Sequence, residues 1–332
     1  MDDFVLGLDI GGTNIRGATV SKNGKIISIT KIPSIPFEKN LFYCISEQID
    51  KNFSNKTVNI GIGSAGPLDP ITGFLHSPEN LTCGEYPLKE KVIIEFNAQK
   101  VEVRNDLDAI GLGYYHFGES KMQGFQEQAL AIIAPGTGLG ASMLLDGKPY
   151  FGGVNSGYLA CEHGKAPYFG ETVAEIKAKI GHSWEEFTAG KGVISIYKNL
   201  FGESKDPEIK KIIEVADNRD KPWIIENFAR AKKNPNFIKR FSEFKDKKID
   251  QICLSAYENV GKHLGYSIAS FVTNFNPNLV ILEGSISKAF DLMKNAITNA
   301  FQKSVFPAHQ KTPIVLGKLI NAGVLGAASL VF

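Results

Sequence analysis

The residues best suited to chemistry lie at the start of the chain, where positions 4–25 read FVLGLDIGGTNIRGATVSKNGK. An apolar strand ends at Asp9 and runs into the turn Gly11-Gly12-Thr13, followed by Asn14. Glycines let backbone N–H groups approach an anion closely, and Thr13 and Asn14 add hydroxyl and amide donors. Asp9 can reach a phosphate-bound Mg2+ through water. The pattern predicts a phosphate site, with an ordinary tight hairpin as the alternative.

A second glycine-rich turn, Gly136-Thr137-Gly138-Leu139-Gly140, follows an apolar run that ends at Pro135. A strand rather than a helix follows it, which disfavours a dinucleotide-binding fingerprint and leaves a bulged hairpin turn as the alternative. Taken together, the two turns predict a clamp that holds a polyphosphate from both sides. Nucleotide binding is therefore the leading interpretation.

A third candidate is the pair Asn105-Asp106, which follows the short predicted strand Val101–Arg104. On its own the pair is a good helix N-cap signal. Phosphoryl transfer to an alcohol also needs a carboxylate that accepts the hydroxyl proton, and an adjacent amide that fixes a neighbouring hydroxyl. The two roles are compatible, because α/β folds place catalytic residues where a strand ends and a helix begins.

The elements that position these residues follow an α/β pattern. Apolar spacing predicts helices, a β-rich run predicts a strand ending in glycine, and a long helix is followed by a strand near the end. The predicted helices are 40–51, 108–117 and 250–274, and the predicted strands include 57–63 and 279–282. A shift of 123 residues places Gly17-Ala18 on Gly140-Ala141 and Gly24-Lys25 on Gly147-Lys148. This faint repeat favours two related halves, each with its own phosphate-facing hairpin.

The composition limits the classes of protein. The chain has 332 residues, 43% hydrophobic content, 22% charged residues and a net charge of +2, as in a soluble globular protein of two domains. No polyanionic partner is implied. The cysteines are far apart and form no C-x-x-C pair, so neither a zinc site nor a disulfide framework is predicted, and a reducing cytoplasm fits. The start of the chain has no signal-peptide pattern.

Two further stretches suggest other functions but carry little weight. The stretch 230–248 combines basic residues with Phe237, Phe241 and Phe244, which is more typical of a helix with a buried aromatic side than of a nucleic-acid surface. The stretch 312–332 is apolar, but Lys318 and Asn321 interrupt it. It predicts a buried strand and short helix rather than a membrane anchor.

Eight motifs in order give the chain a clear resemblance. DIGGTN, GIGSAGPLD, SPENL, VRNDLDA, APGTGLGA, ACEHGKAP, EEFTAGKGVISIY and NAGVLGAA resemble bacterial glucokinases and the related ROK sugar kinases of the actin-like ATPase superfamily. The resemblance covers nearly the whole chain and is weakest over 201–248. It implies an α/β fold of two actin-like (ribonuclease H-like) domains with a ligand cleft between them. The expected domains are 1–110 plus 318–332, and 111–317 with a helical insert.

The resemblance also assigns roles to individual residues. Asp106 matches the catalytic base. The sugar ligands it implies are Asn80, Asn105, Glu162 and Glu185, with Lys165 facing the same site. The nucleotide ligands it implies are Asp9, Gly11, Gly12, Thr13, Asn14, Gly136, Thr137, Gly138, Gly284 and Ser285. ATP and Mg2+ are the expected cofactors, no structural zinc is expected, and a homodimer is the family's usual assembly.

Some positions depart from the family pattern. Lys165 stands where a sugar-contacting histidine is expected, and it is charged and cannot accept hydrogen bonds. His163 could substitute, although a lone histidine is more often structural. Glu283 replaces a glycine of the adenosine motif, and Glu186 beside Glu185 leaves open which of them faces the sugar. We therefore expect a cytoplasmic kinase for the 6-hydroxyl of glucose. The alternatives are a kinase for another sugar, such as an N-acetylhexosamine, and a non-catalytic sugar sensor.

Overall fold

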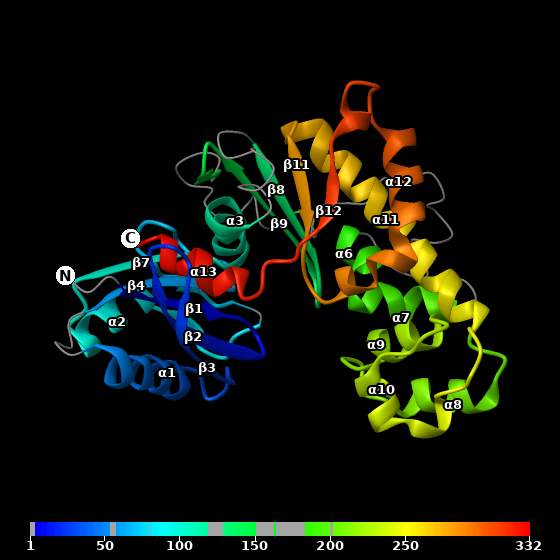
Figure 1. Cartoon of the computed structure of the whole chain (residues 1–332), viewed down its shortest axis with the longest axis horizontal. Helices are drawn as coiled ribbons and strands as arrows, with labels where there is room; N and C mark the ends of the chain where they lie inside the picture. The colour runs from blue at the N-terminus through cyan, green and yellow to red at the C-terminus, as the bar shows by residue number, and fades with distance from the viewer. Residues whose placement is uncertain are drawn as a thin grey trace.

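A computed structural model of the chain describes residues 4–53, 58–78, 80–118, 129–150, 163, 183–199 and 202–332. Two lobes are each built on a five-stranded sheet, with strand orders β3-β2-β1-β4-β7 and β10-β9-β8-β11-β12 (Figure 1). In both sheets the first three strands of that order are antiparallel and the last two run parallel to the third. The shared topology agrees with two related halves, and the predicted α/β class is confirmed.

The small lobe holds the first phosphate turn and the pair Asn105-Asp106. One face of its sheet packs against α1 and α2, and the other face packs against α13, which returns from the far end of the chain (Figure 1). The elements are β1 (Phe4–Ile10), β2 (Asn14–Ser21), β3 (Ile26–Pro33), α1 (Phe37–Asn52), β4 (Asn59–Ser64), β5 (Leu75–His76), β6 (Glu85–Tyr86), α2 (Leu88–Phe96), β7 (Lys100–Asn105) and α13 (Ala322–Ser329).

The helix α3 (Asp106–Phe117) connects the two lobes and contacts both sheets. Its residues Leu112 and Tyr114 are buried against β8 and β11 of the large lobe, while Ala109 lies against Gly63 of β4. The predicted helix 108–117 is thus correct but begins two residues earlier. Because α3 runs without a break past position 110, the proposed domain limits 1–110 plus 318–332, and 111–317, stay a prediction.

The large lobe has a helical layer on the side of its sheet opposite α3. The long helix α11 runs almost as the sequence predicts, with Asp250 as its N-cap. The elements are β8 (Leu130–Pro135), β9 (Leu139–Leu145), β10 (Lys148–Pro149), α6 (Trp184–Thr188), α7 (Gly190–Asn199), α8 (Pro207–Val215), α9 (Lys221–Phe228), α10 (Pro235–Arg240), η2 (Ser242–Phe244), α11 (Gln251–Phe275), β11 (Leu279–Leu282), η3 (Ile286–Ala289), α12 (Phe290–Ser304), η4 (His309–Lys311) and β12 (Ile314–Leu316).

The two stretches that suggested other functions pack as ordinary structure. Phe237 and Phe244, within 230–248, are buried in the large lobe's core. The apolar end of the chain forms β12 and α13, and α13 is buried between α3 and the small sheet. Each helix in the described part of the chain is too short or too polar to span a bilayer.

Candidate functional site

The first glycine turn joins β1 to β2 and accepts two hydrogen bonds from Ser34. The hydroxyl of this buried serine donates to the carbonyl of Gly11 (2.7 Å), and its N–H donates to the carbonyl of Thr13 (3.1 Å). Gly12 and Thr13 themselves are exposed. The turn is therefore held in one conformation while its tip remains open to a ligand.

Asp9 forms an ion pair with Arg16 across the same hairpin. The register of β1 and β2 places the two residues opposite each other, and Nη1 of Arg16 lies 2.8 Å from Oδ2 of Asp9. Burial raises the pKa of Asp9, and Arg16 opposes that rise by favouring the ionised carboxylate. Arg16 was not among the predicted site residues. Counting outward from the turn would have found it, because an antiparallel hairpin fixes such pairs.

Asn105 and Asp106 share the start of α3. Oδ1 of Asn105 accepts a hydrogen bond from the N–H of Leu107 (2.9 Å), and Oδ1 of Asp106 lies 3.0 Å from the same donor. Asn105 is the N-cap, and Asp106 is the first residue of the helix. The capping role thus falls mainly to the amide. The carboxylate is placed at the carboxyl end of β7, beside the strand that ends at Ser64.

The environment of Asp106 favours its neutral form. Burial raises the pKa of Asp106 to about 7, with further contributions from the negative charges of Asp9 and Asp108. Hydrogen bonding from Leu107 opposes this but does not cancel it. Asp108 is itself buried and accepts a hydrogen bond from the hydroxyl of Ser142 on β9 (2.5 Å). A carboxyl group that titrates near neutrality is well matched to accept and release a proton.

Asn80 lies directly against the first glycine turn. A Cβ added to Gly12 would fall 2.8 Å from the Cβ of Asn80 and 2.9 Å from its carbonyl oxygen. Real Cβ atoms do not approach other atoms so closely, so only glycine permits this contact. The structure thus brings the predicted sugar ligand Asn80 to the predicted phosphate turn. Asn105 is close to a neighbouring loop, because its Nδ2 atom would lie 3.2 Å from a Cβ on Gly66.

The second glycine turn lies close to two segments from elsewhere in the chain, at Ser285 and at Gly190. It joins β8 to β9, so the prediction of a strand after it is correct. A Cβ added to Gly136 would lie 3.8 Å from the hydroxyl of Ser285, and the N–H of Gly190 donates to the carbonyl of Gly136 (2.8 Å). Thr137 at its tip and Ser285 are exposed. Gly136, Gly138, Gly284 and Ser285 therefore gather at one edge of the large sheet.

Glu185 reaches this turn from α6. A Cβ on Gly138 would lie 2.8 Å from Oε2 of Glu185, and Oε1 lies 2.7 Å from Nζ of Lys191. Glu186 instead closes a capping box with Ser183, accepting from its N–H at 2.9 Å. Glu185 therefore lies against the second glycine turn while Glu186 caps α6, and a role for Glu185 at the sugar stays a prediction. Lys191 was missed, because its pairing with Glu185 spans two helices and no local spacing indicates it.

Two predicted sugar ligands, Glu162 and Lys165, lie outside the described residues. Their neighbour His163 is described and is structural. Its Nε2 atom is hydrogen bonded to Oγ of Ser267 (2.9 Å), and its ring packs against Trp184 and Phe271. Burial lowers the pKa of His163 to about 4, so the imidazole is neutral at physiological pH. His163 therefore belongs to the core rather than to a sugar site.

The residues at the first turn suit a metal ion that the nucleotide itself carries. In the described part of the chain, no group of three or more His, Cys, Asp or Glu side chains could hold a metal. Asp9 offers one carboxylate, which Arg16 already pairs. Mg2+ commonly keeps several waters and binds through one or two carboxylates plus substrate phosphates. Asp9 fits that mode of binding.

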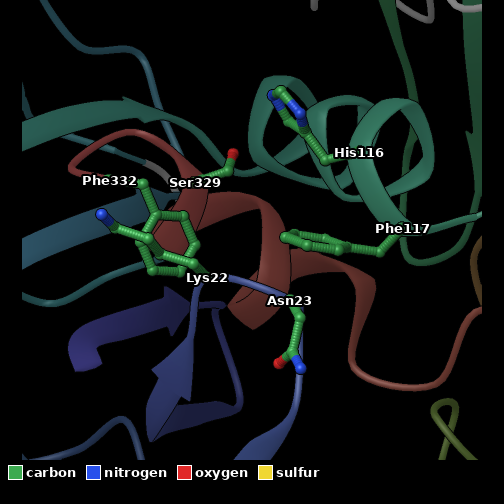
Figure 2. Close-up of a pocket in the computed structure, with 6 residues that line it drawn as sticks. All are labelled: Lys22, Asn23, His116, Phe117, Ser329 and Phe332. Atoms are coloured by element: carbon green, nitrogen blue, oxygen red, sulfur yellow. The ribbon is translucent and has the colours of Figure 1, made fainter. Parts of the chain in front are cut away.

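A separate cavity of about 380 Å3 is shown in Figure 2. None of the predicted site residues that the structure describes is among its lining residues. It lies where the β2–β3 turn, the last turn of α3 and the final residues of the chain meet, and its lining residues are Lys22, Asn23, His116, Phe117, Ser329 and Phe332.

The fold is the two-domain fold of actin-like ATPases. The structure of a ROK family glucokinase from Streptomyces griseus, in complex with glucose and AMPPNP, covers 99% of both chains with a TM-score of 0.71 and 22% identity. A ROK family transcriptional regulator, a homologue of the E. coli MLC protein, covers 99% of this chain and 77% of its own with a TM-score of 0.69 and 15% identity.

The profile of the ROK family matches residues 5–332, and the chain belongs to this family. A glucokinase of Halalkalibacterium halodurans is 25% identical over 99% of this chain and 95% of its own length. An N-acetyl-D-glucosamine kinase of Haemophilus influenzae is 22% identical over 98% of both chains. The relatives thus include kinases for more than one sugar.

Proposed function

We propose that the protein is a glucokinase, which transfers the γ-phosphoryl group of ATP to the 6-hydroxyl of glucose. The observation that carries this proposal is Asp106, a carboxyl group whose pKa is raised to about 7 by burial and then by Asp9. Asp106 is the first residue of α3, and it interacts electrostatically with the carboxylate of Asp9 near the end of β1. A group of this kind is what proton removal from an alcohol requires.

In the proposed reaction, the 6-hydroxyl gives its proton to Asp106 while its oxygen attacks the γ-phosphorus in line. The bond from that phosphorus to the bridging oxygen of ADP breaks, and ADP leaves with the bonding electrons. The turns at Gly11–Asn14 and Gly136–Gly138 supply backbone donors to the phosphates, with Thr13 and Thr137 adding hydroxyls. When bound with the nucleotide beside Asp9, Mg2+ would offset the charge of the transferring group.

The sugar would be fixed by hydrogen bonds from Asn80, Asn105, Glu162 and Glu185. A buried polar group left without its partner costs about 1–3 kcal/mol, so such contacts discriminate strongly between sugars. Gly284 and Ser285 would approach the adenosine. Two lobes with the site between them favour closure on sugar binding, which excludes water and limits wasteful hydrolysis of ATP.

A panel of sugars tests the proposal. ADP release with ATP and Mg2+ is measured for glucose, mannose, N-acetylglucosamine and N-acetylmannosamine, and we expect the highest kcat/KM on glucose. Equal or greater kcat/KM on an N-acetyl sugar would contradict the glucose assignment. It would favour the second candidate function, a kinase for an N-acetylhexosamine. That candidate is motivated by Lys165 and by the N-acetyl-D-glucosamine kinase relative.

A sensor without activity is the third candidate, in view of the regulator with a similar fold. The presence of Asp106, with its raised pKa, favours catalysis. A sugar that binds but releases no ADP under any condition of the panel would support the sensor.

We also propose a cytoplasmic homodimer. Cys44, Cys83 and Cys253 are free thiols, as expected in a reducing compartment. Light scattering coupled to gel filtration would establish the assembly, and a monomer at micromolar concentration would contradict it.

A further inference from the structure

Tyr114 connects α3, the helix that begins at Asp106, to the residues of the large lobe that are predicted to bind the nucleotide. This tyrosine follows Asp106 on α3 by about two helical turns and has no exposed surface (0%). Its hydroxyl donates to Oε1 of Glu283, directly after β11, and accepts from the N–H of Leu319 (3.1 Å). One oxygen atom therefore connects α3, the end of β11 and the segment that leads to α13.

Glu283 links Tyr114 to the predicted adenosine turn. Its second carboxylate oxygen, Oε2, accepts from the N–H of Gly284 (3.2 Å), and its own N–H donates to the carbonyl of Ile133 on β8 (3.0 Å). Gly284 has a φ of +87°, and a Cβ there would fall 2.5 Å from the carbonyl oxygen of Pro135. The carboxylate of Glu283 thus lies between the hydroxyl of Tyr114 and the backbone turn at Gly284. That turn packs against Pro135, the residue before Gly136.

The backbone of Gly317 packs closely against Tyr114 and Glu283. A Cβ on Gly317 would lie 2.3 Å from the hydroxyl of Tyr114 and 2.8 Å from Oε1 of Glu283, so the backbone closes directly over the pair. In Figure 1 the chain passes between the lobes through α3 and again through the segment between β12 and α13. Both connections touch the hydroxyl of Tyr114.

We propose that Tyr114 and Glu283 are positioning residues that hold the helix of the base in register with the nucleotide turns. The inference rests on the proposed function, because it assumes that Asp106 is the base and that Gly284 and Ser285 approach the nucleotide. Neither Tyr114 nor Glu283 contacts a reacting atom. They act through the orientation of Gly284 and through the placement of α3 relative to the large sheet.

Tyr114→Phe is the first test, because it removes only the hydroxyl. A fluorescent ADP analogue reports nucleotide affinity without any sugar, and steady-state kinetics report the two KM values. We expect the Kd for the ADP analogue and the KM for ATP to rise about five- to tenfold, because only part of the effect of a lost hydrogen bond to a charged group is transmitted to the nucleotide turn. The KM for the sugar should change less than about twofold.

Glu283 provides two further variants. Glu283→Ala should weaken binding at least as much as Tyr114→Phe. Glu283→Gln should recover only part of the affinity, because its single amide oxygen can accept from Tyr114 or from Gly284 but not from both. In the double variant Tyr114→Phe/Glu283→Ala, the loss should be smaller than the sum of the two single losses, since the residues act as one unit. Full additivity of the two losses would contradict the inference.

Tyr197→Phe is the matched control. Tyr197 is also buried, and its hydroxyl accepts from the N–H of Ser204 (2.7 Å), away from the two glycine turns. Both tyrosine variants should lose thermal stability, but only Tyr114→Phe should weaken nucleotide binding. If the Kd for the ADP analogue were unchanged in Tyr114→Phe, the pair would be merely structural and the inference would fail.

The outcomes separate this inference from the proposed function. A parent protein that binds the ADP analogue but phosphorylates no sugar contradicts the kinase, while the comparison of Kd values still decides the role of Tyr114 and Glu283. A parent protein that does not bind the analogue overturns the inference as well.

Discussion

Asp9 and Asp106 flank the same strand of the small sheet and interact electrostatically. Asp9 lies near the end of β1, Asp106 follows β7, and β4 runs between these two strands. Burial is the larger cause of the raised pKa of Asp106, and the negative charge of Asp9 is the second. Arg16, paired with Asp9 at 2.8 Å, is the nearby cation that favours the ionised form of Asp9.

The pH dependence of kcat/KM should therefore report the titration of Asp106. A general base works only when deprotonated, and the pKa of Asp106 is about 7. We expect the rate to fall about tenfold per pH unit below that value and to level off above it. Steady-state assays with a non-titrating sugar and saturating ATP would measure this. A profile that stays flat down to about pH 5 would rule out a base with a raised pKa.

Asp106→Asn should reduce turnover by more than about 100-fold and leave sugar binding largely intact, as for the loss of a positioned base. The amide keeps the size of the side chain and can still accept from Leu107. Isothermal calorimetry gives the sugar Kd, and the coupled assay gives kcat. Turnover near the parent rate would show that Asp106 is not the base.

The same variant should change stability in a pH-dependent way. Because the pKa of Asp106 is raised from 3.8, the folded protein retains a proton that the unfolded chain releases, so the free energy of unfolding falls as pH rises from about 4 to 7. Asp106→Asn removes this decrease in the free energy of unfolding with rising pH. Its Tm should exceed that of the parent at about pH 8, by more than at about pH 5. An equal difference at both pH values would contradict the assignment.

Asp9→Asn should move the acid limb of the rate profile. Removing the neighbouring negative charge lowers the pKa of Asp106, so the residual activity should persist to lower pH than in the parent. The measurement is the pH profile at saturating ATP, because the affinity for the nucleotide should also fall. Asp220→Asn is the control, since Asp220 pairs with Arg240 on the large lobe and should leave the profile in place.

Gly12→Ala and Gly11→Ala form a matched pair within one turn. A Cβ on Gly12 meets Asn80 at 2.8 Å, whereas the nearest atom to a Cβ on Gly11 is the carbonyl oxygen of Asn14 at 3.6 Å, an ordinary contact. Gly12→Ala should displace Asn80 and raise the sugar KM by about tenfold or more. Gly11→Ala should raise it much less. Equal effects would show that the contact with Asn80 does not determine sugar binding.

The fold could be predicted from the sequence wherever strong local signals occur. The predicted helix 250–274 is α11, with Asp250 as its N-cap, and both glycine turns join antiparallel strands. Apolar periodicity places these elements because each buries one face. The repeat at 123 residues indicated the shared sheet topology from only a few positions.

The candidate site could be predicted only in part, because its contacts are long-range. The sequence indicated Asp106 and the glycine turns, and the hairpin register would have supplied Arg16. No spacing in the chain indicates that Lys191 pairs with Glu185, or that Tyr114 reaches Glu283. Such pairs depend on how helices and sheets pack in three dimensions, which a local pattern does not contain.

The return of α13 to the small lobe has a consequence for synthesis. Residues of this helix, including Val324 and Leu325, fill one face of the sheet that β1 begins. Domains usually fold as units as they leave the ribosome, the N-terminal one first. Here the ribosome must complete the large lobe before α13 is made. Until then, the part of this apolar face that α13 covers has only α3 beside it, which makes it the surface that a chaperone would protect.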